Sequence, residues 1–200
     1  MKRFLRTPIA ATAFALATLL PFHGALNTAG AANSQSYEEQ STFSTDEIVA
    51  QGHNFFGSTT KGLAQAVESV FAKAGRPRGY IIGEEGAAAF VGGLRYGEGT
   101  LYIKGGPKQK VFWQGPSVGF DFGGNGSRTL VLVYDIDTPR DIFTRFLGVE
   151  GSAYLVGGFG VNFQSNEKIK MAPIRTGVGA RLGANIGYLK YTSRPTWNPF

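Results

Sequence analysis

The spacing of apolar residues changes once along the chain, near residue 79. Before that point, apolar side chains recur every three or four positions over residues 58–74, which predicts an amphipathic helix. Gly75 and Pro77 follow, and both residue types are typical of a helix end. The apolar stripe that this helix is expected to bury consists of Leu63, Val67, Val70, Phe71 and Ala74.

Two shorter helices are predicted from their capping residues. Ser44 and Glu47 have the spacing of a capping box, and Gly57 ends the apolar run that follows them. Further along, Pro139 suits the first position of a helix, and Gly148 ends the segment. The apolar face of this short internal helix is expected to comprise Ile142, Phe143, Phe146 and Leu147.

From residue 79 onward, short apolar runs between glycines predict β-strands. Residues 130–134 are apolar without interruption and predict the best-buried strand. In the long final run, residues 175–191, glycines occupy most of one face, which indicates close packing or a coiled sheet. The predicted strands are residues 80–82, 88–96, 99–104, 110–114, 117–123, 130–134, 152–156, 160–164 and 175–191.

Composition supports a mainly β fold. The chain has 29 glycines and 13% aromatic residues, which favours strands and turns over helices. Many short strands with few helices predict one closed or nearly closed antiparallel sheet, and glycine kinks allow such a sheet to bend. The predicted fold is a small antiparallel β-barrel of about eight strands, with one or two N-terminal helices and one short internal helix.

The first 31 residues have the pattern of a signal peptide. Three cations precede an apolar stretch at residues 9–22, which is too short to span a bilayer comfortably. Ala29 and Ala31 then supply the small-x-small pattern that a signal peptidase requires, so we expect cleavage near Ala31 and export to the periplasm. The expected organisation is a signal peptide (1–31), a flexible arm (32–43), one folded domain (44–193) and an irregular tail (194–200).

Charge and residue usage exclude several classes of protein. The net charge of +6 falls to +3 without the three cations of the predicted signal peptide, and no run of five basic residues occurs, so no nucleic-acid partner is expected. The chain lacks cysteine, and His53 is the only histidine beyond the signal peptide. Thiol chemistry, disulfides and zinc sites built from cysteines or clustered histidines are therefore excluded. We expect no metal, no cofactor and a monomer.

Four carboxylates are the remaining candidates for chemistry. Asp135 and Asp137 follow a predicted buried strand, where they could bind a divalent cation or cap the turn into the helix at Pro139; we favour the capping role. Glu84 and Glu85 are flanked by glycines, and we interpret them as a solvated hairpin tip rather than an acid–base pair. A hydrolase that uses Glu84, Asp135 or Asp137 stays an alternative, but we expect no enzyme.

Four cations lie around the predicted helix of residues 58–74. Basic residues at a helix C-terminus interact favourably with the helix dipole, which accounts for most of these positions without any ligand. The alternative is a docking patch for anionic lipid head groups. The residues are Lys61, near the start of the helix, and Lys73, Arg76 and Arg78, near its end.

Five segments follow one another in a recognisable order. They are GPSVGFDFG at 115–123, LVLVY at 130–134, the predicted short helix from Pro139, GSAY at 151–154 and GARLG at 179–183. In this order they resemble the EipA family of alphaproteobacterial envelope-integrity proteins, over roughly residues 45–193. The resemblance implies a periplasmic protein with a role in envelope integrity and stress resistance, and with no assigned biochemistry.

The same stretch is similar, more distantly, to the SYLF (Ysc84-like) lipid-binding domain. That domain also combines N-terminal helices, a Gly-rich sheet and a closing Gly-rich strand. The likeness implies a small β-barrel, a lipid-binding or envelope-binding role and no catalysis. Because lipid contact in SYLF domains is associated with the N-terminal helical part, the likeness points to Lys61, Lys73, Arg76 and Arg78 as lipid-binding residues.

We therefore predict a periplasmic, non-catalytic β-barrel that supports cell-envelope integrity. Its expected partner is anionic lipid, or a polysaccharide or peptidoglycan component of the envelope. The alternatives left open are a small integral outer-membrane barrel and the carboxylate-based hydrolase. The terminal Phe200 is typical of outer-membrane barrels, but Pro195 and Pro199 interrupt the final strand that such barrels need.

Overall fold

Two N-terminal helices and ten strands make up most of the regular structure among the described residues. The computed structural model describes residues 36–37, 39–57, 61–88, 93–117, 127–176, 187–196 and 198. The predicted signal peptide, residues 118–123 and residues 177–186 lie outside these ranges. The elements are α2 (Thr45–Phe56), α3 (Lys61–Ala74), β1 (Gly79–Ala88), β2 (Gly93–Ile103), β3 (Gln109–Ser117), β4 (Ser127–Tyr134), the 3-10 helix η1 (Pro139–Ile142), β5 (Arg145–Gly148), β6 (Tyr154–Val156), β7 (Phe159–Val161), β8 (Gln164–Ser165), β9 (Lys170–Arg175) and β10 (Tyr188–Thr192).

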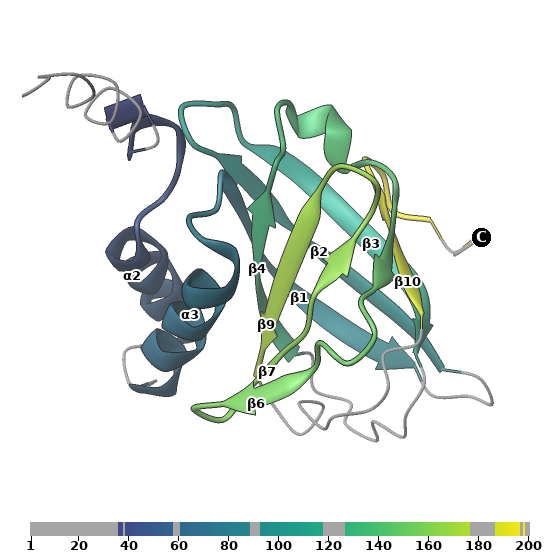
Figure 1. Ribbon diagram of the computed structural model, residues 1–200. Coiled ribbons are helices and arrows are strands. Elements are labelled where there is room, and N and C mark those ends of the chain that lie inside the picture. Colours follow the sequence, from purple (N-terminus) through teal and green to yellow (C-terminus); the bar gives the residue numbers. More distant parts are fainter. Residues whose placement is uncertain are drawn as a thin grey trace, which may run out of the picture.

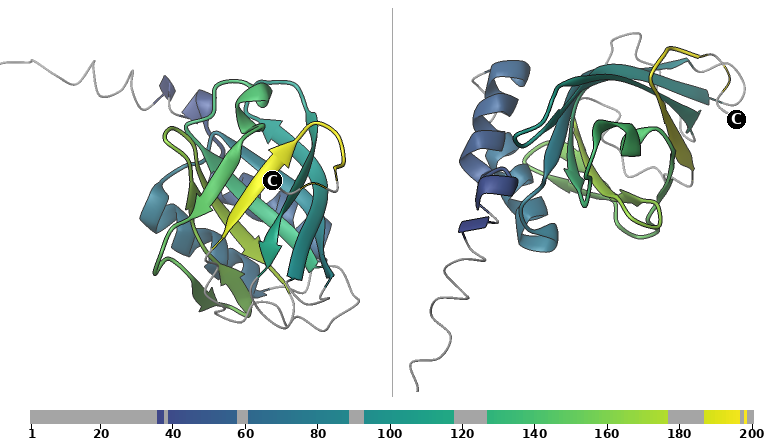
Figure 2. Two further views of the ribbon diagram at one scale, coloured as in Figure 1. Left: turned by 90° about the vertical axis from the view of Figure 1, so that its right-hand side faces the viewer. Right: turned by 90° about the horizontal axis from the view of Figure 1, so that it is seen from above.

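The strands form one antiparallel sheet that closes on itself. In the order β4-β1-β2-β3-β10-β5-β8-β9 each strand pairs with the next, and β9 also pairs with β4. Eight strands therefore form a closed barrel. Strand β7 pairs with the same edge of β9 as β8, and β6 pairs with β7 as a hairpin. Seen from above, η1 lies across the mouth of the ring, and α2 and α3 lie against its outside (Figures 1 and 2). The structure confirms the predicted fold class.

Strand β4 separates two hydrophobic cores. Successive side chains of a strand point to opposite faces. Val131 and Val133 point into the barrel, whereas Leu130 and Leu132 pack outward beneath the helices. Because both faces are covered, residues 130–134 are all buried, as predicted. The inner core contains Ile81, Leu101, Ile103, Val111, Trp113, Val131, Val133, Ile136, Ile142, Phe146, Ile169, Met171, Leu189 and Tyr191.

The two helices form the cover of the outer core. Leu63, Val67 and Val70 of the predicted stripe are fully buried against the barrel wall. At the start of α3, the backbone of Gly62 touches that of Gly157 in the β6–β7 turn, so that a side chain at either position would overlap the other residue. Among the described residues, no helix is both long and apolar enough to cross a bilayer.

The capping box predicted for the first helix is present. The Ser44 backbone N–H donates to Glu47 Oε2 at 2.8 Å, and the Glu47 N–H donates to Ser44 Oγ at 3.2 Å. These two bonds satisfy donors that a helix N-terminus leaves unpaired. They fix the point at which α2 begins.

The end of the arm predicted at residues 32–43 is packed rather than flexible. Residues 36–37 and 39–41 are helical. The Phe43 N–H donates to the Pro77 carbonyl at 2.9 Å, and its ring packs edge-on against Tyr80 at 5.0 Å. Thr42 accepts a hydrogen bond from Arg76 Nε at 2.9 Å. Phe43, one residue before the predicted start of the folded domain, therefore packs against the outer core.

Two predicted strand boundaries are wrong. Residues 88–96 and 99–104 do not form separate strands, because Ala88 ends β1 and Gly93–Ile103 is one continuous strand. Glycine at 97 suggests a break in the sequence, yet it lies inside β2 beneath the indole of Trp113. The run predicted at 160–164 is divided between β7 and β8. Gly97 therefore provides space for a neighbouring side chain and does not end a strand.

The predicted internal helix and final strand are also corrected. Only Pro139–Ile142 is helical, and Phe146 lies in β5, where its side chain fills the barrel interior. Arg175 ends β9 instead of beginning a strand over 175–191. Strand β9 escapes prediction because Pro173 suggests a strand breaker. Its carbonyl accepts from the Asn162 N–H between β7 and β8. Proline has no N–H to donate in return, so the ladder along β9 is interrupted at this position.

Candidate functional site inside the barrel

Glu85 lies inside the barrel, so its predicted place at a solvated hairpin tip is wrong. Strand β1 continues through it to Ala88 and pairs with β2 and β4 on its two sides. Glu85 shares the inward face of Ile81, and only 7% of its surface is exposed. Its neighbour Glu84 is exposed on the other face, 3.8 Å from the Arg128 guanidinium. Two adjacent glutamates therefore have opposite environments.

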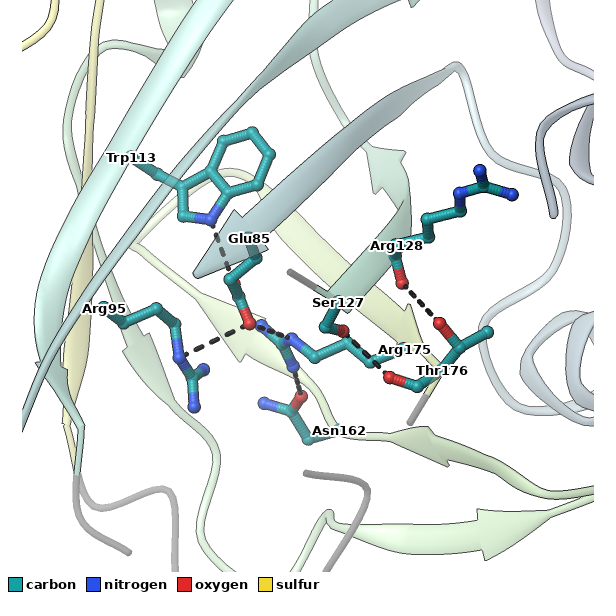
Figure 3. Close-up of polar contacts among 8 residues, drawn as sticks. All are labelled: Glu85, Arg95, Trp113, Ser127, Arg128, Asn162, Arg175 and Thr176. Atoms are coloured by element: carbon teal, nitrogen blue, oxygen red, sulfur yellow. Dashed lines mark hydrogen bonds and ion pairs between the residues drawn. The ribbon is translucent and has the colours of Figure 1, made fainter. Parts of the chain in front are cut away.

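Two arginines and a tryptophan surround the Glu85 carboxylate (Figure 3). Arg175 Nε donates to Oε1 at 3.0 Å, and Arg95 Nε approaches the same oxygen at 3.4 Å. Trp113 Nε1 donates to Oε2 at 3.0 Å. The three partners come from β9, β2 and β3, so the barrel wall brings them together from distant parts of the sequence. We call Glu85, Arg95, Trp113, Asn162 and Arg175 the interior cluster.

Asn162 extends the interior cluster beyond Arg175. Arg175 Nη1 donates to Asn162 Oδ1 at 2.6 Å, and because a guanidinium can only donate, this bond fixes the orientation of the amide. Asn162 Nδ2 is buried and has no hydrogen-bond partner among the described residues. The same is true of Thr129 Oγ1, and Thr129 lies directly opposite Arg175 in the β4–β9 ladder. Buried polar groups of this kind are uncommon in folded proteins.

Glycines on β1 and β2 make room for the Trp113 ring. A methyl group at Gly97 would overlap the indole, and one at Gly83 would lie 2.8 Å from Trp113 Cη2. Both positions face inward, in line with Glu85. The absence of side chains at these two positions lets the indole lie flat along the barrel wall with its N–H directed at the carboxylate.

The charges of the interior cluster determine the ionisation of Glu85. Burial alone would raise its pKa, but the guanidinium groups of Arg175 and Arg95, with the Trp113 hydrogen bond, hold the pKa below its usual value of 4.5. Burial raises the pKa of the nearby Tyr191 hydroxyl, which stays neutral. Glu85 is therefore a carboxylate at neutral pH, and two cationic side chains share one anion.

The other two predicted carboxylates, Asp135 and Asp137, lie on the surface. Asp137 pairs with Lys168 at 2.5 Å, and Asp135 is exposed with a positive φ of 58°. Neither caps the turn into η1: that role belongs to Asp141, whose Oδ2 accepts from the Thr138 N–H at 2.8 Å. The described part of the chain contains no group of three or more acidic, histidine or cysteine side chains that could hold a metal ion.

The four predicted lipid-binding cations are not gathered in one place. Lys61 and Lys73 are separated by about 18 Å along α3, at 1.5 Å per residue, and the Lys61 side chain is outside the described part of the structure. Lys73 is exposed and stacks on the Tyr154 ring, with Nζ 3.5 Å from its centre. Arg76 and Arg78 are half-buried, and Arg76 bonds to the N-terminal segment.

Sequence reasoning missed every member of the interior cluster in this role. The signal available is a period of two: Ile81, Gly83 and Glu85 occupy alternate positions, as do Arg95, Gly97 and Gly99 on β2. Reading β1 through its glycines would have placed Glu85 on the core face. Nothing local indicates that Arg175 lies beside it, because that pairing depends on closure of the ring.

The fold and its interior define a class: a small closed antiparallel β-barrel, covered on one side by two helices, with a buried arginine–glutamate cluster inside. Within that class, the chain belongs to the envelope integrity protein A (EipA) family, whose family model matches residues 41–200. The chain is also similar to a β-barrel-like, uncharacterised protein from Brucella abortus whose crystal structure is known. The two sequences are 57% identical, and the structures superpose with a TM-score of 0.74. The similarity covers 80% of this chain and 99% of the Brucella chain. No curated protein matches this chain.

Proposed function

We propose that this chain works in the periplasm as a non-catalytic barrel that supports envelope integrity by binding an anionic envelope component. Its membership of the EipA family carries the envelope role. The leader pattern of residues 1–31 supports the compartment. The excess of cations over carboxylates, both inside the barrel and at the end of α3, supports an anionic partner.

The arrangement of carboxylates favours binding over hydrolysis. Paired-carboxylate hydrolysis needs two acidic groups within about 10 Å of each other. Asp135 is separated from Glu84 by about 20 Å along the β1–β4 ladder, at roughly 3.3 Å per residue. Glu85 is held ionised by two arginines and a tryptophan, so it is a poor proton donor or acceptor. A hydrolase that pairs Glu84 or Glu85 with Asp135 therefore gains no support from these features.

The outer faces of the strands favour a barrel outside the bilayer. Lipid-facing strand positions of outer-membrane barrels are apolar, and charges there are costly. Here exposed charges stand on the outer faces of three neighbouring strands: Glu84 on β1, Glu98 on β2 and Lys110 on β3. The helices α2 and α3 cover the outer faces of β4 and β9 and part of that of β1 (Figure 2). A peripheral role therefore fits better than an integral one.

Anionic lipid is the partner that the α3 cations fit best. Lys73 extends into solvent over Tyr154, and a ring beneath an ammonium group holds it in place without neutralising it. Arg76 and Arg78 lie a few residues further on, so attraction to head groups would be shared. Each cation near an anionic surface contributes about 1 kcal/mol, or roughly fivefold in affinity.

Two measurements test the proposal. Osmotic release should free the protein without detergent, with an N-terminus near Ala32. Co-sedimentation should then show binding to vesicles that contain phosphatidylglycerol but not to phosphatidylcholine alone, and this binding should weaken with salt because exposed charges are screened.

The variant Lys61→Gln/Lys73→Gln leaves the half-buried arginines in place and should weaken vesicle binding by more than tenfold if each charge contributes about 1 kcal/mol. Lys110→Gln removes one exposed charge from β3 and serves as the matched control. Wild-type protein that ignores anionic vesicles at low salt rules out the lipid partner. Protein that is released only with detergent rules out the peripheral barrel.

A further inference from the structure

We propose that the barrel interior binds an oxyanion, a carboxylate or phosphate group of the envelope component, beside Arg175 and Asn162. The site lies at the end of the barrel where β1 ends and β2 and β4 begin. This inference rests on the proposed function for the identity of the molecule that carries the anionic group. The site itself rests on the donors that the structure describes.

The cluster holds more donors than acceptors. A guanidinium has five N–H donors, and the contacts of Arg175 with Glu85 and Asn162 engage two of them. The Glu85 carboxylate already accepts from Arg175 and Trp113 and forms an ion pair with Arg95. Asn162 Nδ2 adds a buried N–H group that has no partner in the described part of the chain. An oxyanion beside this amide would accept from it and from Arg175.

Charge and burial favour the same ligand class. Two arginines contact the one Glu85 carboxylate, so cationic groups outnumber carboxylates in these contacts. Solvent and salt screen a buried charge only weakly. Charge-assisted hydrogen bonds are therefore stronger inside the barrel than in water. The Thr129 hydroxyl, opposite Arg175 on β4 and also without a partner in the described residues, can donate as well. A cation or an apolar ligand would leave these donors unsatisfied.

The cluster borders solvent at Arg95. The side chains of Glu85 and Arg175 keep 6% and 11% of their surface exposed, whereas that of Arg95 keeps 17%. Exposure therefore increases from the carboxylate toward Arg95. In Figure 3 the Arg95 and Asn162 side chains lie on the same side of Glu85, opposite Trp113. Of these three side chains, Arg95 is the one that an anion from solvent would meet first.

The test uses a substitution that supplies the missing anion. Asn162→Asp places a carboxylate next to Arg175 without a change of shape. Asn166→Asp makes the same chemical change in a surface turn, where the side chain accepts from the Lys168 and Ile169 N–H groups and can continue to do so. Melting temperatures are measured in chloride, in inorganic phosphate and in acetate at equal ionic strength. Comparison of phosphate with acetate separates the two oxyanion classes.

The expected result has three parts. Wild-type Tm rises by about 3 °C or more at roughly ten times the Kd of phosphate or acetate. Asn162→Asp melts higher than wild type in chloride and loses this response, whereas Asn166→Asp keeps it. Phosphate also stabilises proteins generally by exclusion from their surface, so the difference between the two variants is the measure of binding.

Tryptophan fluorescence is a second measurement, and it keeps the proposal testable if Asn162→Asp does not fold. Trp113 contacts Glu85 directly, and Trp197→Phe leaves Trp113 as the only tryptophan. In that background the Trp113 emission should change with phosphate or acetate, and Thr129→Val should weaken the change. A wild-type Tm and a Trp113 emission that respond to neither anion overturn the proposal. Because no vesicle is present, that result leaves the lipid-binding test of the α3 cations unaffected.

Discussion

The two ends of the barrel interior are filled by different kinds of side chain. At the end closed by η1, the interior contains Ile136, Ile142 and Phe146, all fully buried. At the other end it contains the charged interior cluster around Glu85. Rings connect the two: Tyr191 packs edge-on against Phe146 at 5.5 Å and lies 5.7 Å from Trp113. One continuous interior therefore has an apolar half and a charged half.

The difference teaches how each half is stabilised. Apolar packing tolerates substitution, because replacement by a residue of similar volume costs little stability. A buried ion pair does not, because removal of one partner leaves the other charge buried and unpaired. The apolar half accounts for much of the stability of the fold. The charged half is expected to contribute little net stability for its size, because the desolvation of its charges offsets much of their attraction.

The largest effect should come from loss of the central anion. Glu85→Gln leaves two arginines without their shared carboxylate and should lower the free energy of unfolding by about 3–5 kcal/mol. Glu84→Gln, one residue away on the outer face, should change it by less than about 0.5 kcal/mol. Urea unfolding of both variants measures the contrast. Equal midpoints would remove the distinction between the two faces of β1.

A smaller effect is expected where the wall makes room for the indole. Gly97→Ala places a methyl group against Trp113 and should cost about 1–3 kcal/mol through overpacking. Gly86→Ala adds a methyl group that meets nothing within 4 Å and should be neutral or slightly stabilising. Thermal melts compare the two. A Gly97→Ala protein as stable as wild type would show that Trp113 is free to move.

A glycine outside the barrel allows the effect of backbone conformation on stability to be compared with the effect of crowding. Gly158 has φ +83° and open space around its Cα, so the difficulty with a side chain there is the backbone conformation and not crowding. Gly158→Val should cost about 1–2 kcal/mol, and Gly158→Asn distinctly less, because asparagine adopts left-handed conformations more readily. If both variants lose the same stability in urea, crowding in the β6–β7 turn is the cause instead.

The smallest effect should appear on acidification. The folded pKa of Glu85 lies below 4.5, so its contribution is fully present above pH 4.5 and is lost as pH falls through the lower folded value. Between pH 5 and pH 4 only the beginning of this loss is reached. The difference in unfolding free energy between wild type and Glu85→Gln should therefore start to narrow below about pH 4.5. A difference that narrows already between pH 7 and pH 6 would contradict an ionised Glu85.

Local patterns sufficed for the parts of the fold that depend on neighbours in sequence. The capping box at Ser44 and the apolar stripe of α3 were predictable because a helix is built from contacts three and four residues apart. The buried strand at 130–134 was predictable from its uninterrupted apolar run. The barrel class followed from many short strands and abundant glycine.

The interior cluster could not be predicted, because it depends on contacts between residues far apart in the sequence. Glu85 and Arg175 are 90 positions apart, and their contact depends on the pairing of β4 with both β1 and β9. Gly83 and Gly97 imitate turns in the sequence because their packing partner, Trp113, lies on another strand. At these two positions glycine provides space for a distant side chain, and the local sequence does not distinguish that role from a turn.

The position of β10 affects the order in which the chain can fold. Strand β10 (residues 188–192) lies between β3 and β5, so the ring stays open until these late residues are available. Such long-range pairing makes folding slow. A nascent chain therefore cannot close the ring before β10 has been synthesised, however early its helices and first strands form.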